Sequence, residues 1–338
     1  MPVSAFICGC AGLSLTAWER RFLREAQPWG LILFKRNVDS PAQLADLTAS
    51  FRDAVGRSDA PVLVDQEGGR VQRLGPPHWP VYPSAASYLK GGGSLESAAK
   101  LVRLTAQLMA TDLARVGINV DCLPVLDVTY ADSHRVIGDR AYGSDPAAIA
   151  RLGRAAAEGL LSAGVLPVMK HLPGHGRALA DSHLELPVVT ASRTELEASD
   201  FLPFMTNADL PIGMSAHVIY PVLDLERPAT TSPVVIQEII RGRIGFDGLL
   251  LSDDLSMQAL SGTLRERAEA ALGAGIDVVL HCNGNPDEMQ DVAAVSPPLT
   301  GRALARAEAA LARLARPVTD FDPVDARARL NSALAMAV

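Results

Sequence analysis

Short apolar runs rich in Val, Leu and Ile recur along the chain, and stretches with helical spacing of apolar residues separate most of them. Runs of this kind are typical of parallel strands that are buried on both faces of a sheet. The pattern predicts eight strands, at residues 5–9, 30–34, 61–65, 119–126, 166–171, 212–217, 248–251 and 277–280.

The stretches between the runs carry helix signals. Ser40 followed by Pro41 and Gln43 is a capping-box pattern with proline at the first helical position. Helices are predicted at residues 16–26, from 41 onward, and at 94–116, 145–163, 192–204, 265–274 and 301–315.

Eight strands joined mostly by helices predict an α/β fold, a single (β/α)₈ barrel of the TIM type. There is no Gly-rich dinucleotide fingerprint and no break in composition that would mark a second domain. We therefore expect one catalytic barrel domain over residues 1–338, with residues 317–338 as a C-terminal tail that packs on the barrel.

Polar side chains gather where the predicted strands end. The active site of such a barrel lies at the carboxyl ends of its strands. A pocket is therefore expected at that face, and the polar run from Asp65 to Arg73 supports it. The strand-end residues are Asp65, Lys170, His171, His217 and Asp253.

The loop after the fifth strand reads KHLPGHGRALADSHLELP over residues 170–187. Its proline and glycines prevent a regular strand or helix. Asp181 and His183 are two residues apart, so the carboxylate is able to accept from the imidazole and raise its basicity. The alternative is a surface turn. It is disfavoured because the loop begins at a strand end that itself carries Lys170 and His171.

Two further groups have a structural alternative. Asp253 and Asp254 end a buried strand, where Asp also serves as a helix N-cap. Alternation along the strand allows one carboxylate to cap while the other points into the barrel mouth. Arg73 and Arg140 are surface cations by default, and in a sugar pocket they would hold hydroxyl or acetamide oxygens.

Composition excludes several classes of protein. The formal net charge of −7 at pH 7 gives no basic field for nucleic acid or anionic lipid. No leader-like basic segment and no apolar stretch of about 18 residues is present, which predicts a cytoplasmic protein without a membrane partner. The four cysteines lie in apolar runs and lack a C-x-x-C pair, so buried thiols are favoured over disulfides or a Cys₄ metal site.

Four motifs together carry a resemblance to a known family. VDQEGGRVQR, PVLDV…IGDRAYG, KHLPGHG…DSH and SDDLSM occur in this order within residues 29–283. Their combination resembles the family 3 glycoside hydrolases of the NagZ type. These are single-barrel β-N-acetylglucosaminidases of bacterial cell-wall recycling.

The resemblance implies a retaining exo-β-N-acetylglucosaminidase that removes terminal N-acetylglucosamine from peptidoglycan fragments through a glycosyl-aspartate. It implies Asp253 as the nucleophile and His183 as the general acid/base with Asp181 as its partner. It implies no cofactor and no metal, and a small muropeptide substrate. The sugar-binding residues that it implies are Asp65, Arg73, Arg140, Lys170 and His171.

The chain departs from the family pattern at Leu172, Arg177 and His281, which affects substrate detail rather than the reaction. The physical logic agrees with the resemblance, because a retaining glycosidase needs a carboxylate on one side of the anomeric carbon and a proton donor on the other.

Two other classes of function remain as alternatives. One is a metal-dependent barrel hydrolase, but the first strand has no H-x-H. The other is a non-catalytic sugar-binding protein, which the presence of both Asp253 and His183 disfavours. The ligands in the metal-dependent reading would be His171, His175, His183, His217 and Asp253.

Overall fold

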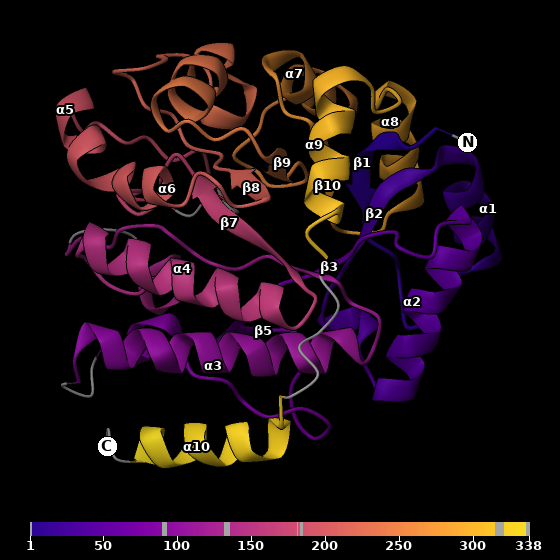
Figure 1. The fold of residues 1–338 in the computed structure, drawn as a ribbon. Helices are drawn as coiled ribbons and strands as arrows, with labels where there is room; N and C mark the ends of the chain where they lie inside the picture. The colour runs from indigo at the N-terminus through magenta and orange to yellow at the C-terminus, as the bar shows by residue number, and fades with distance from the viewer. Residues whose placement is uncertain are drawn as a thin grey trace.

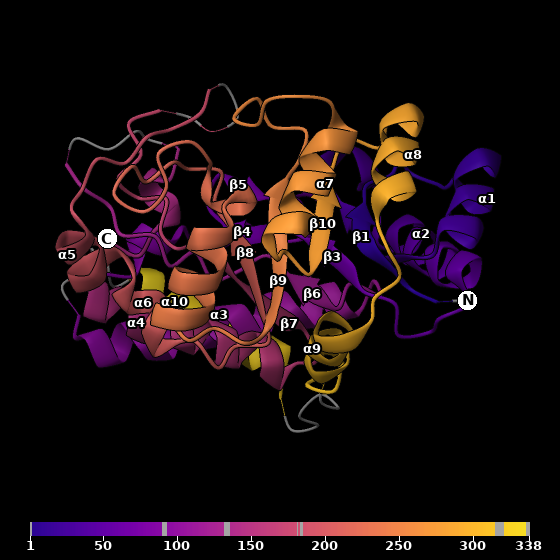
Figure 2. The ribbon, with the colours of Figure 1, turned by 90° about the horizontal axis from the view of Figure 1, so that it is seen from above.

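The computed structural model describes residues 2–89, 93–131, 136–180, 182, 185–314 and 321–335. Eight parallel strands close into a barrel in the order β1-β10-β9-β8-β7-β6-β3-β2, as predicted (Figures 1 and 2). The strands are β1 (Ser4–Cys8), β2 (Pro28–Leu33), β3 (Val62–Val64), β6 (Val120–Asp121), β7 (Leu166–Leu172), β8 (Ile212–Ser215), β9 (Leu249–Asp254) and β10 (Val278–His281).

Alternation along the strands divides the apolar residues between two cores. In β1, Ala5 and Ile7 belong to the cluster that fills the barrel, and Phe6 and Cys8 belong to the cluster between the barrel and its helices. Successive strand side chains point to opposite faces, and both faces are covered here. This double burial explains why the strands read as continuous apolar runs.

Helices surround the barrel and begin where their caps predict. Ser40 Oγ accepts from the backbone N–H of Gln43 at 3.4 Å at the start of α2. The helices are α1 (Ala17–Ala26), α2 (Pro41–Val55), α3 (Leu95–Ala114), α4 (Pro146–Ser162), α5 (Arg193–Glu195), α6 (Leu202–Thr206), α7 (Leu264–Ala274), α8 (Pro286–Val295), α9 (Gly301–Leu311) and α10 (Pro323–Ala335), with π-helical segments at Leu196–Asp200 and Val235–Arg243 and 3₁₀ turns at Lys35–Asn37, Ala85–Ser87, Gly138–Arg140 and Ala229–Thr231.

Some boundaries differ from the prediction. The fourth strand is regular only over Val120–Asp121, because Pro124 has no N–H for the ladder, although Leu126 still donates to the Lys170 carbonyl at 2.8 Å. The seventh strand continues to Asp254 instead of ending at Leu251. The predicted helix over residues 192–204 is three consecutive helical pieces, and the helix from Gly301 ends at Leu311.

Several elements were absent from the prediction, among them the helix α10 in the tail. The polar run after β3 forms an antiparallel hairpin of β4 (Gln66–Gly68) and β5 (Val71–Gln72). The segments Val235–Arg243 and Pro286–Val295 are helical. The hairpin matters for the site, because it folds the residues that follow Asp65 back over the barrel mouth.

The final helix lies along α3 on the outside of the barrel (Figure 1). Ala326 and Leu330 are buried there, and Arg327 Nη2 lies 3.3 Å from Asp112 Oδ2. The described part of the tail is therefore a packed helix.

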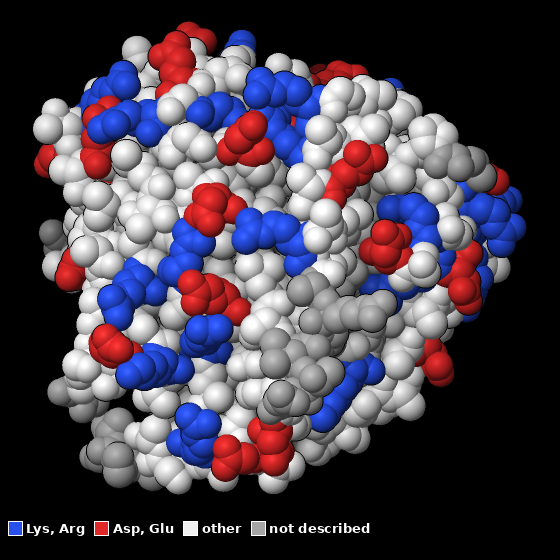
Figure 3. All heavy atoms as spheres, in the orientation of Figure 1, with Lys and Arg blue, Asp and Glu red and all other residues white. Residues whose placement is uncertain are grey.

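The molecular surface over α3 and α4 carries mixed charge (Figure 3). Basic and acidic side chains are interspersed there, for example Arg151 and Glu96, whose Nη2 and Oε2 atoms are 3.3 Å apart. None of the helices in the described ranges combines the length and the apolar character that a membrane span requires.

Candidate active site

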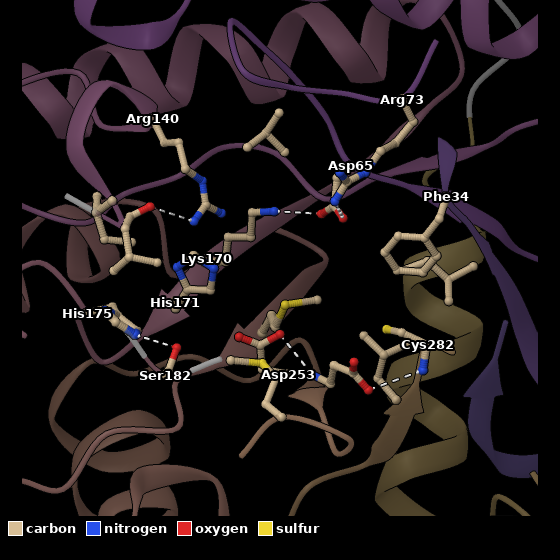
Figure 4. A pocket seen from close by; sticks show the side chains of 18 of the residues that line it. Phe34, Asp65, Arg73, Arg140, Lys170, His171, His175, Ser182, Asp253 and Cys282 are labelled. Atoms are coloured by element: carbon tan, nitrogen blue, oxygen red, sulfur yellow. Dashed lines mark hydrogen bonds and ion pairs between the residues drawn. The ribbon is translucent and has the colours of Figure 1, made fainter. Parts of the chain in front are cut away.

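A cavity of about 530 Å³ opens at the carboxyl ends of the barrel strands (Figure 4). All six predicted catalytic or binding residues that the structure describes line it. Its polar lining residues are Asp65, Arg70, Arg73, Arg140, Lys170, His171, His175, Ser182, Asp253 and Asp254, and its other lining residues are Ile32, Phe34, Val71, Val136, Ile137, Met214, Met257, Leu280 and Cys282.

Asp65 binds two of the predicted cations. Its Oδ1 accepts from Lys170 Nζ at 2.9 Å, and its Oδ2 accepts from Arg73 Nη2 at 2.9 Å. Burial raises the pKa of Asp65, but Lys170 and Arg73 lower it by more, and the net pKa is well below its usual range. The carboxylate is thus ionised and joins the ends of β3 and β7.

Glu67 is a second carboxylate in this group, and the prediction of binding residues omitted it. It lies on β4, and its Oε1 is 2.7 Å from Lys170 Nζ. Arg140 binds it with two parallel hydrogen bonds of 2.8 Å, from Nε to Oε2 and from Nη2 to Oε1. Arg140 is therefore no surface cation. Its guanidinium fixes Glu67, which in turn fixes Lys170.

The Lys170 side chain is only 2% exposed. Burial lowers its pKa, but Asp65 and Glu67 raise it by more, and the net pKa lies above the usual range. We call the five charged residues Asp65, Glu67, Arg73, Arg140 and Lys170 the ionic wall. Its cations exceed its carboxylates by one, and the ion pairs hold its oxygens and N–H groups in place.

The ionic wall gives a prediction for stability. We expect Glu67→Gln to lower the free energy of unfolding by about 3–5 kcal/mol at pH 7, because Lys170 and Arg140 would lose a buried counter-charge. Burial raises the pKa of Glu67, but Lys170 and Arg140 lower it from 4.5 to about 2. The wild-type carboxylate therefore contributes stability above pH 4.5 that is lost as the pH falls toward 2.

The difference between wild type and variant should shrink by about 1.4 kcal/mol per pH unit below pH 4.5. Urea unfolding at pH 7, 4.5 and 3.5 measures it. Glu96→Gln is the matched control, because the Glu96 side chain is 62% exposed and its ion pairs should contribute less than about 1 kcal/mol. A difference that does not change with pH would contradict the lowered pKa.

His171 is oriented by a buried aspartate. Its Nδ1 is 2.7 Å from Asp127 Oδ2, and Asp127 Oδ1 accepts from the backbone N–H of His175 at 2.6 Å. Burial raises the pKa of Asp127, but His171 lowers it by more, so the net pKa falls below its usual range. The prediction of site residues omitted Asp127. It fixes the plane of the His171 ring that faces the cavity.

Asp253 lies near the end of β9 and faces Lys170 and His171 across the cavity (Figure 4). It is partly buried, and its Oδ1 accepts from the backbone N–H of Asp254 at 2.8 Å. Burial raises its pKa, but His171 and then His217 lower it by more, and the net pKa is below the usual range. An ionised carboxylate is thus presented to the cavity.

Asp254 has a structural task, but it is not the helix N-cap that the sequence suggested, because a turn follows β9 and the next helix begins at Leu264 behind its cap Thr263. Asp254 Oδ1 accepts from the backbone N–H groups of Ser256 at 3.0 Å and Cys282 at 3.2 Å, and its Oδ2 accepts from Ser256 Oγ at 2.6 Å. These bonds hold the turn after β9 against the end of β10, so Asp254 fixes the backbone on which Asp253 is placed.

The predicted acid/base pair, Asp181 and His183, lies outside the described residues. Ser182 between them is described. It is 2% exposed, and its Oγ lies 3.0 Å from His175 Nε2. His175 and Ser182 both line the cavity, on the opposite side from Phe34 and Cys282 (Figure 4).

His217 is buried and takes no part in lining the cavity, although a strand-end position was predicted for it. Its Nδ1 is 2.8 Å from Thr230 Oγ1, and its Nε2 is 3.0 Å from the Asp254 carbonyl oxygen. Both ring nitrogens are engaged within the protein. Over the described ranges, the His, Cys, Asp and Glu side chains form no group of three or more with the geometry of a metal site.

The four cysteines are free and buried, as predicted. Cys282 lines the cavity, and burial raises the pKa of its thiol well above the usual value. It therefore behaves as an apolar lining group rather than as a thiolate.

Comparison with known proteins agrees with this geometry. Residues 13–316 match the glycosyl hydrolase family 3 N terminal domain. A beta-hexosaminidase of Bordetella avium is 40% identical over 299 residues, covering 86% of this chain and 84% of that protein. One from Pseudomonas aeruginosa is 42% identical over 277 residues, covering 80% of each.

Solved structures agree as well. NagZ from Neisseria gonorrhoeae in complex with N-trifluoroacetyl-D-glucosamine superposes with a TM-score of 0.85 and 31% identity, covering 100% of this chain and 99% of that chain. A family 3 beta-N-acetylglucosaminidase from Paenibacillus has a TM-score of 0.85 and 29% identity, covering 96% of this chain and 66% of that chain. Barrel, cavity and relatives lead to one conclusion: this chain belongs to glycosyl hydrolase family 3 and is a glycoside hydrolase of the NagZ type.

Proposed function

We propose that this enzyme is a retaining exo-β-N-acetylglucosaminidase that acts through a covalent glycosyl-aspartate on Asp253. The observation that carries the proposal is the placement of Asp253, an ionised carboxylate at the end of β9, across the cavity from the ionic wall and His171. A sugar ring bound against that wall would have a carboxylate within reach of its anomeric carbon.

In the first step, Asp253 would attack the anomeric carbon while the bond to the leaving oxygen breaks. We assign to His183 the proton that the leaving oxygen needs. When a histidine donates this proton, the site requires only one carboxyl group, the nucleophile. Asp181 would orient that imidazole and stabilise its cationic form. The products of this step are a glycosyl ester on Asp253 and the free alcohol.

In the second step, neutral His183 would take a proton from water as that water attacks the anomeric carbon of the ester. The bond between the sugar and Asp253 breaks, the carboxylate is restored and His183 is protonated again. Two displacements at one carbon return the original configuration, so the released sugar keeps the β configuration.

The ionic wall and His171 would bind the terminal sugar, with Asp65, Arg73, Arg140, Lys170 and His171 as its ligands. Ion pairs within the wall leave further N–H groups and lone pairs for hydroxyl and acetamide oxygens, since an ammonium has three donors and a guanidinium five. A pocket of about 530 Å³ with such a lining suits a compact polar ring.

We further propose that the natural substrates are muropeptides with N-acetylglucosamine linked to 1,6-anhydro-N-acetylmuramic acid, cleaved in the cytoplasm during cell-wall recycling. The whole chain, residues 1–338, would serve as one catalytic domain. The support is the similarity to solved NagZ enzymes, one of them in complex with an N-acylated glucosamine.

Turnover of an aryl β-N-acetylglucosaminide tests the proposal directly. Proton NMR during hydrolysis should show the β anomer of N-acetylglucosamine first, before mutarotation. If the α anomer appeared first, the double-displacement mechanism would be wrong, and an absence of turnover would contradict the assigned activity.

The same site predicts selectivity for the acetamide. We expect aryl N-acetylglucosaminide to exceed aryl glucoside in kcat/KM by roughly five- to 150-fold, because a buried donor left without its acceptor costs about 1–3 kcal/mol. Initial rates with the two p-nitrophenyl glycosides measure this ratio. Equal kcat/KM values for the two substrates would mean that no hydrogen-bond donor of the site binds the acetamide.

A further inference from the structure

Three of the five residues of the ionic wall lie on or beside the hairpin of β4 and β5. Asp65 directly precedes β4, Glu67 lies within it, and Arg73 directly follows β5. The two strands are only three and two residues long and form a sheet of their own. A two-stranded hairpin by itself is marginally stable, so further contacts are needed to hold these side chains at fixed positions.

The Gln66 side chain closes this hairpin from the inside. It extends from β4, and the residue is only 1% exposed. Its Oε1 accepts from the backbone N–H groups of Arg73 and Leu74, each at 3.0 Å, and its Nε2 donates to the Leu74 carbonyl oxygen at 2.9 Å. One buried amide therefore fixes the backbone from which the Arg73 side chain extends.

The Gln66 backbone is in turn held by the barrel. Its N–H donates at 3.0 Å to Oδ1 of Asp121, a buried residue on β6. Burial raises the pKa of Asp121 well above its usual range, which favours the neutral carboxyl group. A series of hydrogen bonds thus runs from a barrel strand through Gln66 to the backbone of Arg73.

The Arg73 guanidinium is fixed to the same short segment as its backbone. Its Nη2 donates to Asp65 Oδ2 at 2.9 Å, and its Cζ lies 5.2 Å from the centroid of the Phe34 ring on the cavity wall (Figure 4). Asp65 and Gln66 are consecutive in the sequence. A shift of the Arg73 backbone would therefore move the guanidinium relative to Asp65 and to the cavity.

We propose that Gln66 is a positioning residue for sugar binding, because it holds the backbone of Arg73 and so places the guanidinium that binds a hydroxyl group of the terminal sugar. This inference rests on the proposed role of Arg73 as a sugar ligand. Gln66 is not among the residues that line the cavity, so it acts through Arg73 rather than by touching the substrate. Asp121 supports Gln66 in this task.

The expected loss is specific to one position of the sugar. A hydrogen bond to a charged group contributes about 10- to 150-fold, so removing the hydroxyl that Arg73 binds should reduce kcat/KM of the wild-type enzyme by about this factor. We call this factor the deoxy penalty. An enzyme with a displaced guanidinium has already lost the contact, so its deoxy penalty should be smaller. A loss of folded protein, in contrast, lowers the rates on all substrates equally.

The experiment measures kcat/KM for p-nitrophenyl N-acetylglucosaminide and for its 3-deoxy, 4-deoxy and 6-deoxy analogues. Arg73→Met identifies the hydroxyl that Arg73 binds, as the position where the deoxy penalty falls to less than about fivefold. We expect Gln66→Met to lower the penalty at the same position and to leave the other two within about twofold of wild type. Each penalty comes from one enzyme sample and does not depend on the fraction that is folded.

Further variants test the support from Asp121 and provide a control. Asp121→Leu removes the acceptor of the Gln66 N–H and should lower the same deoxy penalty, whereas Asp121→Asn keeps an acceptor oxygen and should restore most of it. Asn207→Leu is the matched control, because this buried amide donates to the carbonyl oxygens of Ala150 at 3.1 Å and Pro203 at 2.8 Å, away from the cavity. It should leave all three penalties unchanged.

The outcomes separate this inference from the function on which it rests. If Arg73→Met lowered one penalty but Gln66→Met lowered none, or lowered all three equally, the positioning role would be overturned and Arg73 would remain a sugar ligand. If Arg73→Met left every penalty unchanged, the assignment of Arg73 as a sugar ligand would fail, and the positioning role with it. A penalty that Asp121→Leu did not change would remove Asp121 from the proposal.

Discussion

Asp253→Ala should abolish turnover, with kcat reduced by about 10⁴-fold or more on every substrate, because the variant has no group to form the glycosyl ester. Folding should remain intact. Asp253 is only partly buried, and its side chain accepts from the backbone N–H of its neighbour Asp254, a local contact whose loss should leave the barrel folded. Steady-state rates and a thermal unfolding curve measured on the same sample test both statements.

Trapping identifies the nucleophile independently. A slow 5-fluoro N-acetylglucosamine derivative should label the wild-type enzyme once, and peptide mass mapping should place the label on Asp253. Asp254→Asn provides a control, since it disturbs the turn after β9 without removing the proposed nucleophile. A label on Asp254 or Glu67 would overturn the assignment.

His183→Ala should lower kcat/KM for a disaccharide by about 10²- to 10⁴-fold, the usual contribution of general acid/base catalysis. The rate of the first step on a dinitrophenyl glycoside should fall far less, because that leaving group departs without a proton. The test is to measure both reductions in rate in the same variant. Their ratio shows how far hydrolysis of the disaccharide depends on a general acid.

Asp181→Asn supplies the graded control for this prediction. The amide keeps the size of the side chain but no longer stabilises an imidazolium, so both steps should slow without losing the histidine. Equal losses on both substrates in His183→Ala would mean that the residue only folds the loop or binds sugar. The next candidate acid would then be His175, the other loop imidazole on the cavity.

The strands could be predicted because burial on both faces leaves a signal in each short segment. Residues 5–8 and 278–280 are apolar in themselves, and closure of the barrel follows from the number and parallel order of such strands. The hairpin of β4 and β5 gives no such signal. Its two strands are short and polar, and their pairing depends on the turn through Gly68 and Gly69, both with positive φ.

Part of the site could be predicted for a similar reason. The polar residues Asp65, Lys170, His171 and Asp253 end buried strands. Burying an unpaired charge costs folding free energy, so such residues indicate either a binding partner or a function. Glu67 and Asp127 were not predicted as site residues, because their partners are 73 and 44 residues away in the sequence. Contacts over such separations are created by barrel closure and leave no local pattern.

The ionic wall divides the cavity into a part that is preorganised and a part that adapts. Its five charges are paired with one another, so sugar binding requires little reorganisation of these groups, and dipoles fixed in advance are the most effective in stabilising a transition state. The rest of the lining includes Phe34, Met214 and Met257, and methionine side chains repack readily. If the ionic wall binds the terminal sugar as proposed, diversification of this enzyme toward new aglycones should proceed through substitutions in the apolar lining.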